Sequence, residues 1–137
     1  MVRATAPQHP GWRLGFMGAT VLTIDDSKAV RDMIRFTLEP EGYTVEEAEH
    51  GQDGLAAMRR VRPRLVITDL NMPVMDGLTF IAQARNDPAG AGIPIIMLTT
   101  ETNPDMKARG KAAGATGWID KPFDADKLVA VARKVLG

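Results

Sequence analysis

The sequence predicts an α/β protein in which five strand–helix units, (βα)5, form a doubly wound parallel sheet. Short apolar runs rich in β-branched residues alternate along the chain with longer amphipathic stretches at helical spacing. The 137 residues, of which 45% are apolar, suffice for one domain with one core. Because strands joined by helices must run in the same direction, the sheet is expected to be parallel with right-handed crossovers.

The first half of the chain supplies two strand–helix units. Residues 20–25 form an apolar run, and Ser27 after it is a residue type that caps helices. Gly42 ends that helix, and the partly alternating residues 43–48 form the second strand. Residues 51–61 form the second helix.

Three more units follow. Strands are expected at residues 64–69, 94–99 and 115–119. The first of these leads through a loop, residues 70–77, into a helix. Asn103 and Asp124 are expected to cap the two later helices, with Pro104 in the first turn of one and Gly114 as its stop. The residues at helical spacing that are expected to face the core, all apolar except Thr37, are Val30, Met33, Ile34, Thr37, Leu38, Leu55, Met58, Val61, Leu78, Ile81, Ala82, Leu128, Val131, Ala132, Val135 and Leu136.

The polarity of the strands predicts their order. The first, third and fourth are almost wholly apolar, as in strands covered on both faces. The second carries Glu46 and Glu47 and the fifth carries Thr116 and Gly117, which edge strands tolerate. The order 2-1-3-4-5 fits, which is the flavodoxin-like arrangement. Such sheets bind ligands at the carboxyl ends of the strands, near the switch point between strands one and three.

Composition limits the partners and the location. Residues 1–19 lack periodicity and are expected to be a disordered extension, followed by one domain over residues 20–137. Lys+Arg and Asp+Glu are both 17, so no basic excess indicates nucleic acid. No apolar run approaches the roughly 20 residues of a membrane span. With no cysteine and no secretory signal, we expect a cytoplasmic protein, and a monomer.

Polar side chains gather where the strands end. Asp25 and Asp26 follow strand one, Asp69 follows strand three, Thr99 ends strand four and Lys121 follows strand five. They are expected to meet at the edge of the sheet where this architecture binds ligands. Strand two, at the outside of the sheet, is expected to contribute nothing to the site.

The charges of this group indicate a metal and a phosphoryl group. Three carboxylates and one lysine sum to −2, which one divalent cation neutralises. Ligands that are all oxygens select a hard ion, Mg²⁺ with Mn²⁺ as the alternative. One aspartate can then attack phosphorus, while Lys121 pairs with one phosphoryl oxygen and the Thr99 hydroxyl donates to another.

From about Thr20 to Leu136 the chain resembles response-regulator receiver domains of two-component signalling. The resemblance is carried by Asp25-Asp26, Asp69-Leu-Asn-Met-Pro-Val-Met-Asp-Gly77, Leu98-Thr99 and Lys121-Pro122-Phe123. It implies that Asp69 accepts a phosphoryl group from a histidine kinase. It implies that Asp26, Asp69 and the backbone carbonyl of Asn71 bind Mg²⁺ directly, and Asp25 through water. It also implies a cis Lys121–Pro122 peptide bond.

The same resemblance implies how a signal leaves the domain. Thr99 is expected to move toward the phosphoryl group while Trp118 turns inward, which remodels the face of helix four, strand five and helix five. A partner protein is expected to bind that face. Because the sequence ends with the fifth helix, we expect a stand-alone regulator of the chemotaxis type. It is expected to be no enzyme beyond catalysing its own phosphorylation and dephosphorylation.

Three alternatives remain open. A phosphorelay intermediate would pass the phosphoryl group to a histidine phosphotransfer protein. An aspartyl-nucleophile phosphatase usually has a second aspartate two residues after the nucleophile, where this chain has Asn71. A flavin-binding module would need a phosphate-cradling loop after strand one, whereas this loop begins with Asp25 and Asp26.

Overall fold

A five-stranded parallel sheet forms the middle layer of the computed structural model, which describes residues 18–136. The strands are β1 (Thr20–Ile24), β2 (Thr44–Ala48), β3 (Leu65–Thr68), β4 (Ile95–Thr99) and β5 (Gly117–Asp120). The helices are α2 (Lys28–Leu38), the short 3₁₀ helix η1 (Glu39–Glu41), α3 (Gly51–Val61), α4 (Gly77–Arg85), α5 (Pro104–Ala113) and α6 (Ala125–Leu136).

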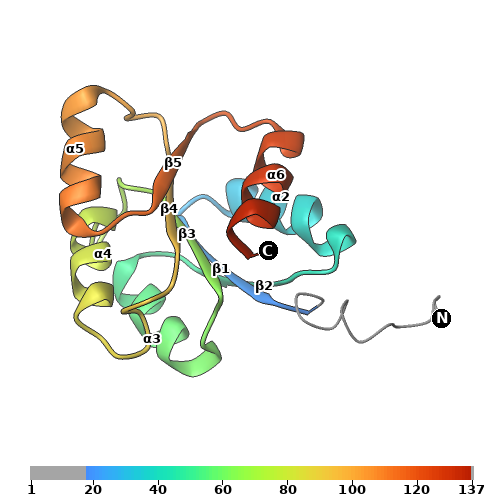
Figure 1. Cartoon of the computed structure of the whole chain (residues 1–137), viewed down its shortest axis with the longest axis horizontal. Helices are drawn as coiled ribbons and strands as arrows, with labels where there is room; N and C mark the ends of the chain where they lie inside the picture. The colour runs from blue at the N-terminus through green and yellow to red at the C-terminus, as the bar shows by residue number, and fades with distance from the viewer. Residues whose placement is uncertain (1–17, 137) are drawn as a thin grey trace.

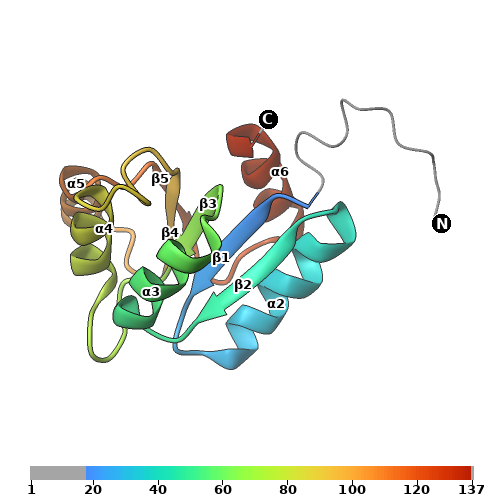
Figure 2. The same ribbon diagram turned by 90° about the horizontal axis from the view of Figure 1, so that it is seen from below.

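The strand order is β2-β1-β3-β4-β5, as the sequence predicts. All four neighbouring pairs are parallel. Figure 2 shows β2 at the outside of the sheet, next to β1. The chain places β2 on one side of β1 and then β3 on the other side. The carboxyl ends of the neighbours β1 and β3 therefore form the topological switch point of the sheet.

Helices cover both faces of the sheet. α2 and α6 lie on one face, and α3, α4 and α5 lie on the other (Figure 1). Each face has its own apolar cluster, because alternate residues of a strand point in opposite directions. Val21, Leu65 and Ile67 face α2 and α6, whereas Leu22, Ile24 and Val66 face the other layer.

Side-chain caps fix the ends of several helices where the sequence places them. Ser27 accepts a hydrogen bond from the Val30 amide, and Asn103 accepts one from the Met106 amide. Gly114 ends α5 at φ 117°, a left-handed conformation that glycine adopts without steric cost. The Asp124 carboxylate accepts from the Asp126 amide at the start of α6.

Two of the helical faces differ from the prediction. α4 buries Phe80, Ile81 and Ala84 rather than Ala82, which is exposed. On α2, Met33 is 49% exposed, and the inward positions are Arg31, Ile34 and Leu38. Both helices carry apolar residues on more than one face, so their spacing alone does not determine which face packs against the sheet.

The disordered extension expected over residues 1–19 does not include Gly18 and Ala19, because these two residues belong to the folded domain. Ala19 is 7% exposed, and the Gly18 amide donates to the Gly42 carbonyl. The predictions made for residues 1–17 lie outside the described residues. Within residues 18–136, no helix has the length and apolar character needed to cross a membrane.

Candidate functional site

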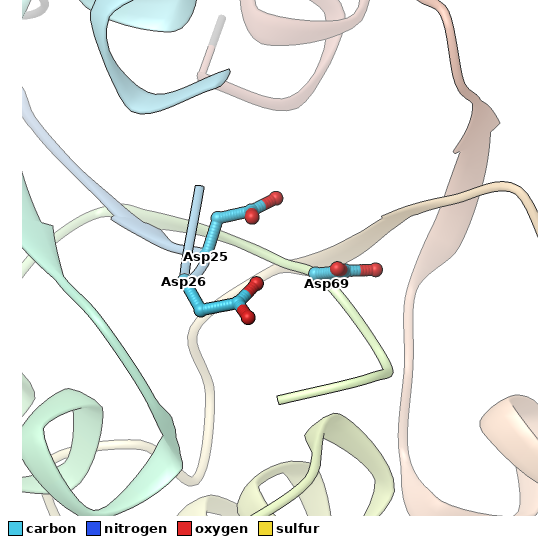
Figure 3. A group of neighbouring side chains, drawn as sticks. All are labelled: Asp25, Asp26 and Asp69. Atoms are coloured by element: carbon cyan, nitrogen blue, oxygen red, sulfur yellow. The ribbon is translucent and has the colours of Figure 1, made fainter. Parts of the chain in front are cut away.

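Three carboxylates meet at the switch point of the sheet. Asp25 and Asp26 follow β1 and Asp69 follows β3, and the three side chains gather in one place (Figure 3). One carboxylate oxygen from each lies within 4.8 Å of the other two. The convergence predicted from the strand ends is confirmed for these three residues.

The backbone of the sheet holds two of the carboxylates in register. Ile24 pairs with Thr68 across β1 and β3, so the next residues, Asp25 and Asp69, leave the sheet at the same level. The Asp69 amide donates to the Ile24 carbonyl at 2.9 Å, and the Asp25 amide donates to the Ala48 carbonyl at 3.1 Å. These bonds extend the parallel ladder by one residue beyond the strands.

Asp25 and Lys121 form a partly buried ion pair. The Lys121 ammonium lies 2.8 Å from Asp25 Oδ2 and 3.2 Å from Asp69 Oδ2, so it links two of the carboxylates. Asp25 is 2% exposed, and its Oδ1 accepts from the Ser27 amide at 2.9 Å. Both carboxylate oxygens of Asp25 thus have partners within the protein.

Burial and charge shift the pKa values of this group. Burial of Asp69, reinforced by the nearby charge of Asp25, raises the pKa of the Asp69 carboxyl, although Lys121 and the Leu70 amide act in the opposite direction. Burial lowers the pKa of Lys121, but its hydrogen bond to Asp25 and the charges of Asp25 and Asp69 outweigh it, so the net shift is upward. Lys121 is therefore a cation at neutral pH.

The residues fit a hard divalent cation. The cluster of three carboxylates carries two more negative charges than Lys121 neutralises, and its free donors are all oxygens. Asp26 is exposed, and Asp69 keeps acceptor capacity beyond the Leu70 amide, 2.7 Å from its Oδ1. A hard dication of the Mg²⁺ type suits this donor set. Asp26 and Asp69 are the carboxylates best placed to hold it.

Thr99 ends β4, and Asn71 lies in the loop after β3. The Lys121 amide donates to the Thr99 carbonyl at 3.0 Å, which continues the pairing of β4 and β5. Thr99 is fully buried, and its hydroxyl accepts from the Glu101 amide at 3.1 Å. The Asn71 side chain donates to the Glu101 carboxylate, which joins the loop after β3 to the loop after β4.

Gly77 and the Lys121–Pro122 bond shape the backbone around the site. A Cβ at position 77 would lie 2.2 Å from the Asp69 carbonyl oxygen, so only glycine lets α4 begin this close to Asp69. The Lys121–Pro122 peptide bond is cis, as the resemblance implies.

Trp118 lies away from the carboxylates. It is on β5, opposite Met97 of β4, and it is 36% exposed. The Lys107 ammonium of α5 lies 5.1 Å from the centre of its ring, within cation–π range. In this structure the ring is therefore on the outer side of β5.

A family model for the response regulator receiver domain matches residues 21–133, which include every residue of this site. The chain belongs to the response regulator receiver domain family. Receiver domains take phosphoryl groups from histidine kinases, act on downstream partners and bind Mg²⁺ at an acidic pocket. They are regulators of two-component systems rather than enzymes of metabolism.

Curated relatives that are transcriptional regulators match this chain over part of their length. The phosphate regulon transcriptional regulatory protein PhoB of Pseudomonas aeruginosa is 37% identical over 120 residues, which are 88% of this chain and 52% of PhoB. The DNA-binding dual master transcriptional regulator RpaA of Synechocystis is 36% identical over 85% of this chain and 48% of RpaA. The chain thus spans about half the length of these curated relatives.

Solved structures of similar length also match. The chemotaxis response regulator CheY4 of Vibrio cholerae is 44% identical, with a TM-score of 0.81 over 85% of this chain and 98% of CheY4. A CheY-like receiver domain protein of Methanospirillum hungatei is 29% identical, with a TM-score of 0.80 over 86% of this chain and 93% of that one. The receiver fold predicted from the sequence is confirmed.

The roles of two side chains were not anticipated from the sequence. Arg31 of α2 donates to the Asp25 carbonyl at 2.6 Å. The His50 side chain caps α3 by accepting from the Asp53 amide at 3.3 Å. The sequence offers one signal for Arg31: it lies three positions before Ile34, and residues at this spacing share a helix face, so it falls on the inward row of α2.

Proposed function

We propose that this receiver domain accepts a phosphoryl group on Asp69 from the phosphohistidine of a histidine kinase. The observation that carries the proposal is the position of Asp69 between Lys121, at 3.2 Å, and two further carboxylates within 4.8 Å. Asp69 is the member of the cluster with both an ammonium partner and a partly exposed carboxylate. Asp25, by contrast, is buried with both oxygens engaged.

The transfer exchanges one bond to phosphorus for another. An Asp69 carboxylate oxygen forms a bond to the phosphorus atom while the N–P bond of the donor breaks. The electron pair of the N–P bond stays on the imidazole nitrogen, which takes a proton from solvent. A bound Mg²⁺ supplies charge neutralisation for the phosphoryl oxygens.

The protein's own side chains position and stabilise the phosphoryl group. Lys121 pairs with one phosphoryl oxygen, for which it must exchange part of its contact with Asp25 and Asp69. The Thr99 hydroxyl donates to another, because its hydrogen is not used by the bond it accepts from the Glu101 amide. Asp26, Asp69 and the Asn71 carbonyl would hold the metal, and Asp25 would act through water.

Phosphorylation by a small donor tests the chemistry directly. The protein is incubated with Mg²⁺ and acetyl phosphate, and intact-mass spectra are recorded. We expect one phosphoryl adduct that requires Mg²⁺ and is absent in Asp69→Asn. Asp126→Asn, an exposed carboxylate in the first turn of α6, is the matched control and should be labelled normally. An adduct of equal yield in Asp69→Asn would refute the assignment.

We also propose that phosphorylation turns Trp118 inward as Thr99 moves, remodelling the face of α5, β5 and α6 for a protein partner. The exposed ring beside Lys107 is the expected starting state. A Trp12→Phe background leaves Trp118 as the one tryptophan. Acetyl phosphate with Mg²⁺ should then change its fluorescence and reduce quenching by iodide. Equal quenching before and after full phosphorylation would rule out the movement.

We infer a receiver domain of the chemotaxis type that is cytoplasmic and monomeric and does not itself bind nucleic acid, with residues 1–17 as an extension of the domain. Support comes from the 44% identity with CheY4, of which 98% is covered, and from the balanced charge. The phosphorelay alternative predicts rapid loss of the adduct to a histidine phosphotransfer protein. The chemotaxis reading predicts instead that the phosphorylated form, and not Asp69→Asn, binds a flagellar-motor switch peptide.

A further inference from the structure

Arg31 is a charged residue on the buried face of α2. It is 9% exposed and occupies the same inward row as Ile34 and Leu38. Arginine is almost never buried unless its guanidinium is paired and hydrogen-bonded. The partners of Arg31 therefore show what its burial is for.

One partner of Arg31 is the backbone of the metal site. Its guanidinium Nη1 donates to the Asp25 carbonyl oxygen at 2.6 Å, and the bond is buried. That carbonyl belongs to the peptide that links Asp25 to Asp26. Both carboxylates of the loop after β1 are thus attached to the two ends of a peptide unit that Arg31 holds.

The other partner is Glu47 on the outer strand β2. Arg31 Nε donates to Glu47 Oε1 at 2.8 Å. The second oxygen, Oε2, accepts from Arg35 Nε at 2.9 Å and Nη2 at 2.6 Å. Burial alone would raise the pKa of the Glu47 carboxyl, but the hydrogen bonds from the two arginines outweigh it and lower that pKa, so Glu47 is ionised at neutral pH. Glu47 therefore fixes the guanidinium plane of Arg31.

We propose that Arg31, held by Glu47, is a positioning residue for the divalent cation of this receiver domain. By fixing the Asp25–Asp26 peptide, it sets the direction in which the two carboxylates leave the backbone. The outer strand β2 then takes part in the site through Glu47, although none of its side chains reaches the carboxylates. The inference rests on the proposed function, since it assigns Arg31 to the metal site of that function.

Charge and position make opposite predictions for this residue. If Arg31 acted through its charge alone, removing it would strengthen cation binding, because one positive charge near the cation would be lost. If it acts by holding the Asp25 carbonyl, removing it weakens binding. Partners behind the direct ligands of a metal typically change its affinity 10–100-fold.

Arg35 is the matched control. It bonds the same Glu47 carboxylate and lies one turn further along α2, but its remaining bond goes to Glu39 rather than to the metal loop. Four variants separate the effects: Arg31→Lys and Arg31→Gln, with Arg35→Lys and Arg35→Gln. Arg31→Lys keeps the charge but loses the planar fork that reaches Asp25 and Glu47 together.

The measurement is the dissociation constant of Mg²⁺ by calorimetric titration, with circular dichroism to establish folding. We expect both Arg31 variants to bind Mg²⁺ about tenfold more weakly than wild type, and both Arg35 variants to stay within about twofold. Acetyl-phosphate labelling of the Arg31 variants should recover at saturating Mg²⁺, which a general loss of structure would not allow. If Arg31→Gln does not fold, Arg31→Lys alone decides.

The outcomes separate this inference from the function on which it rests. Unchanged Mg²⁺ affinity in Arg31→Lys, or tighter binding in Arg31→Gln, would overturn the positioning role while wild-type phosphorylation stands. Equal weakening in the Arg31 and Arg35 variants would also overturn it, because the effect would then belong to the Glu47 network as a whole. Wild-type protein that binds no Mg²⁺ and takes no phosphoryl group would overturn both.

Discussion

Replacing Asp69 by asparagine should make the metal-free protein more stable. The carboxylate of Asp69 lies within 4.8 Å of those of Asp25 and Asp26 and has one cationic partner, Lys121, at 3.2 Å. Asparagine keeps an oxygen that can accept from the Leu70 amide, as Asp69 does at 2.7 Å. The substitution therefore removes the charge while retaining the local hydrogen bond.

The structure gives the size of the effect. At an effective dielectric constant of about 20, each carboxylate pair, separated by no more than 4.8 Å, repels by at least about 3.5 kcal/mol, and the Lys121 contact at 3.2 Å attracts by about 5 kcal/mol. Two repulsions exceed the one attraction by about 2 kcal/mol, and solvent near the exposed Asp26 reduces this. We expect Asp69→Asn to raise the free energy of unfolding by about 1–2 kcal/mol at neutral pH.

The pH dependence follows from the raised pKa of Asp69. Burial makes the folded protein hold the Asp69 proton to a higher pH than the unfolded chain does. Between these two pKa values the folded state binds more protons, so the stability of the wild type falls as pH rises through that window. The advantage of asparagine is complete above the folded-state pKa. It is lost as pH falls through this window, and it is absent well below the unfolded pKa of about 4, where Asp69 is protonated in both states.

Urea unfolding of wild type and Asp69→Asn, between pH 4.5 and 7.5 and with or without Mg²⁺, checks this reasoning. At 100 times its dissociation constant, Mg²⁺ adds about 2.7 kcal/mol to the wild type. The variant, which lacks one ligand charge, should gain less, so the difference between the proteins narrows or reverses. An Asp69→Asn protein less stable than wild type at pH 7 without Mg²⁺ would show that Lys121 outweighs both repulsions.

Three further substitutions test particular contacts by urea unfolding. Val74 is a β-branched residue at φ 68° and is 78% exposed. Val74→Gly should therefore raise the free energy of unfolding by about 1 kcal/mol, and an unchanged urea midpoint would contradict this. Within residues 18–136, the Thr23 hydroxyl is the one buried side-chain polar atom without a hydrogen-bond partner. Thr23→Val should therefore raise the free energy of unfolding by about 1 kcal/mol. A lower free energy of unfolding would indicate that the hydroxyl is hydrogen-bonded. Gly77→Ala should lower the free energy of unfolding by about 1–3 kcal/mol and weaken Mg²⁺ binding, because the added Cβ would meet the Asp69 carbonyl. Wild-type stability in this variant would show that α4 can shift to make room.

The sheet and the charged cluster were predictable because each rests on a local signal. Apolar runs identify strands, the helices between them force parallel pairing, and parallel strands present their carboxyl ends at one edge. Asp25, Asp69 and Lys121 needed only that rule to be placed together. The strand order needed one more signal, the polar residues of β2 and β5, which edge positions tolerate.

The rotation of the helices was harder to predict. On α2, Met33 and Phe36 are apolar yet 49% and 72% exposed, while Arg31 faces the sheet. The predicted positions Ile34 and Leu38 are buried, but the apolar pattern misplaces Met33 and omits Arg31, whose burial depends on an ion pair with Glu47, 16 residues away in sequence. A pattern that scores side chains by hydrophobicity cannot detect a partner on another strand.

The same long-range pairing explains why β2 looked unrelated to the site. Ligands of such sheets bind at the strand ends near the switch point between β1 and β3. Because β1 lies between β2 and the switch point, no direct contribution from β2 was expected. Its contribution passes sideways, from Glu47 through Arg31 to the Asp25 carbonyl, at 2.8 Å and 2.6 Å. A mutation on this outer strand could therefore change cation affinity without touching a ligand. Glu47→Gln, which weakens the hold on Arg31, should lower Mg²⁺ affinity in the same direction as Arg31→Lys and by less.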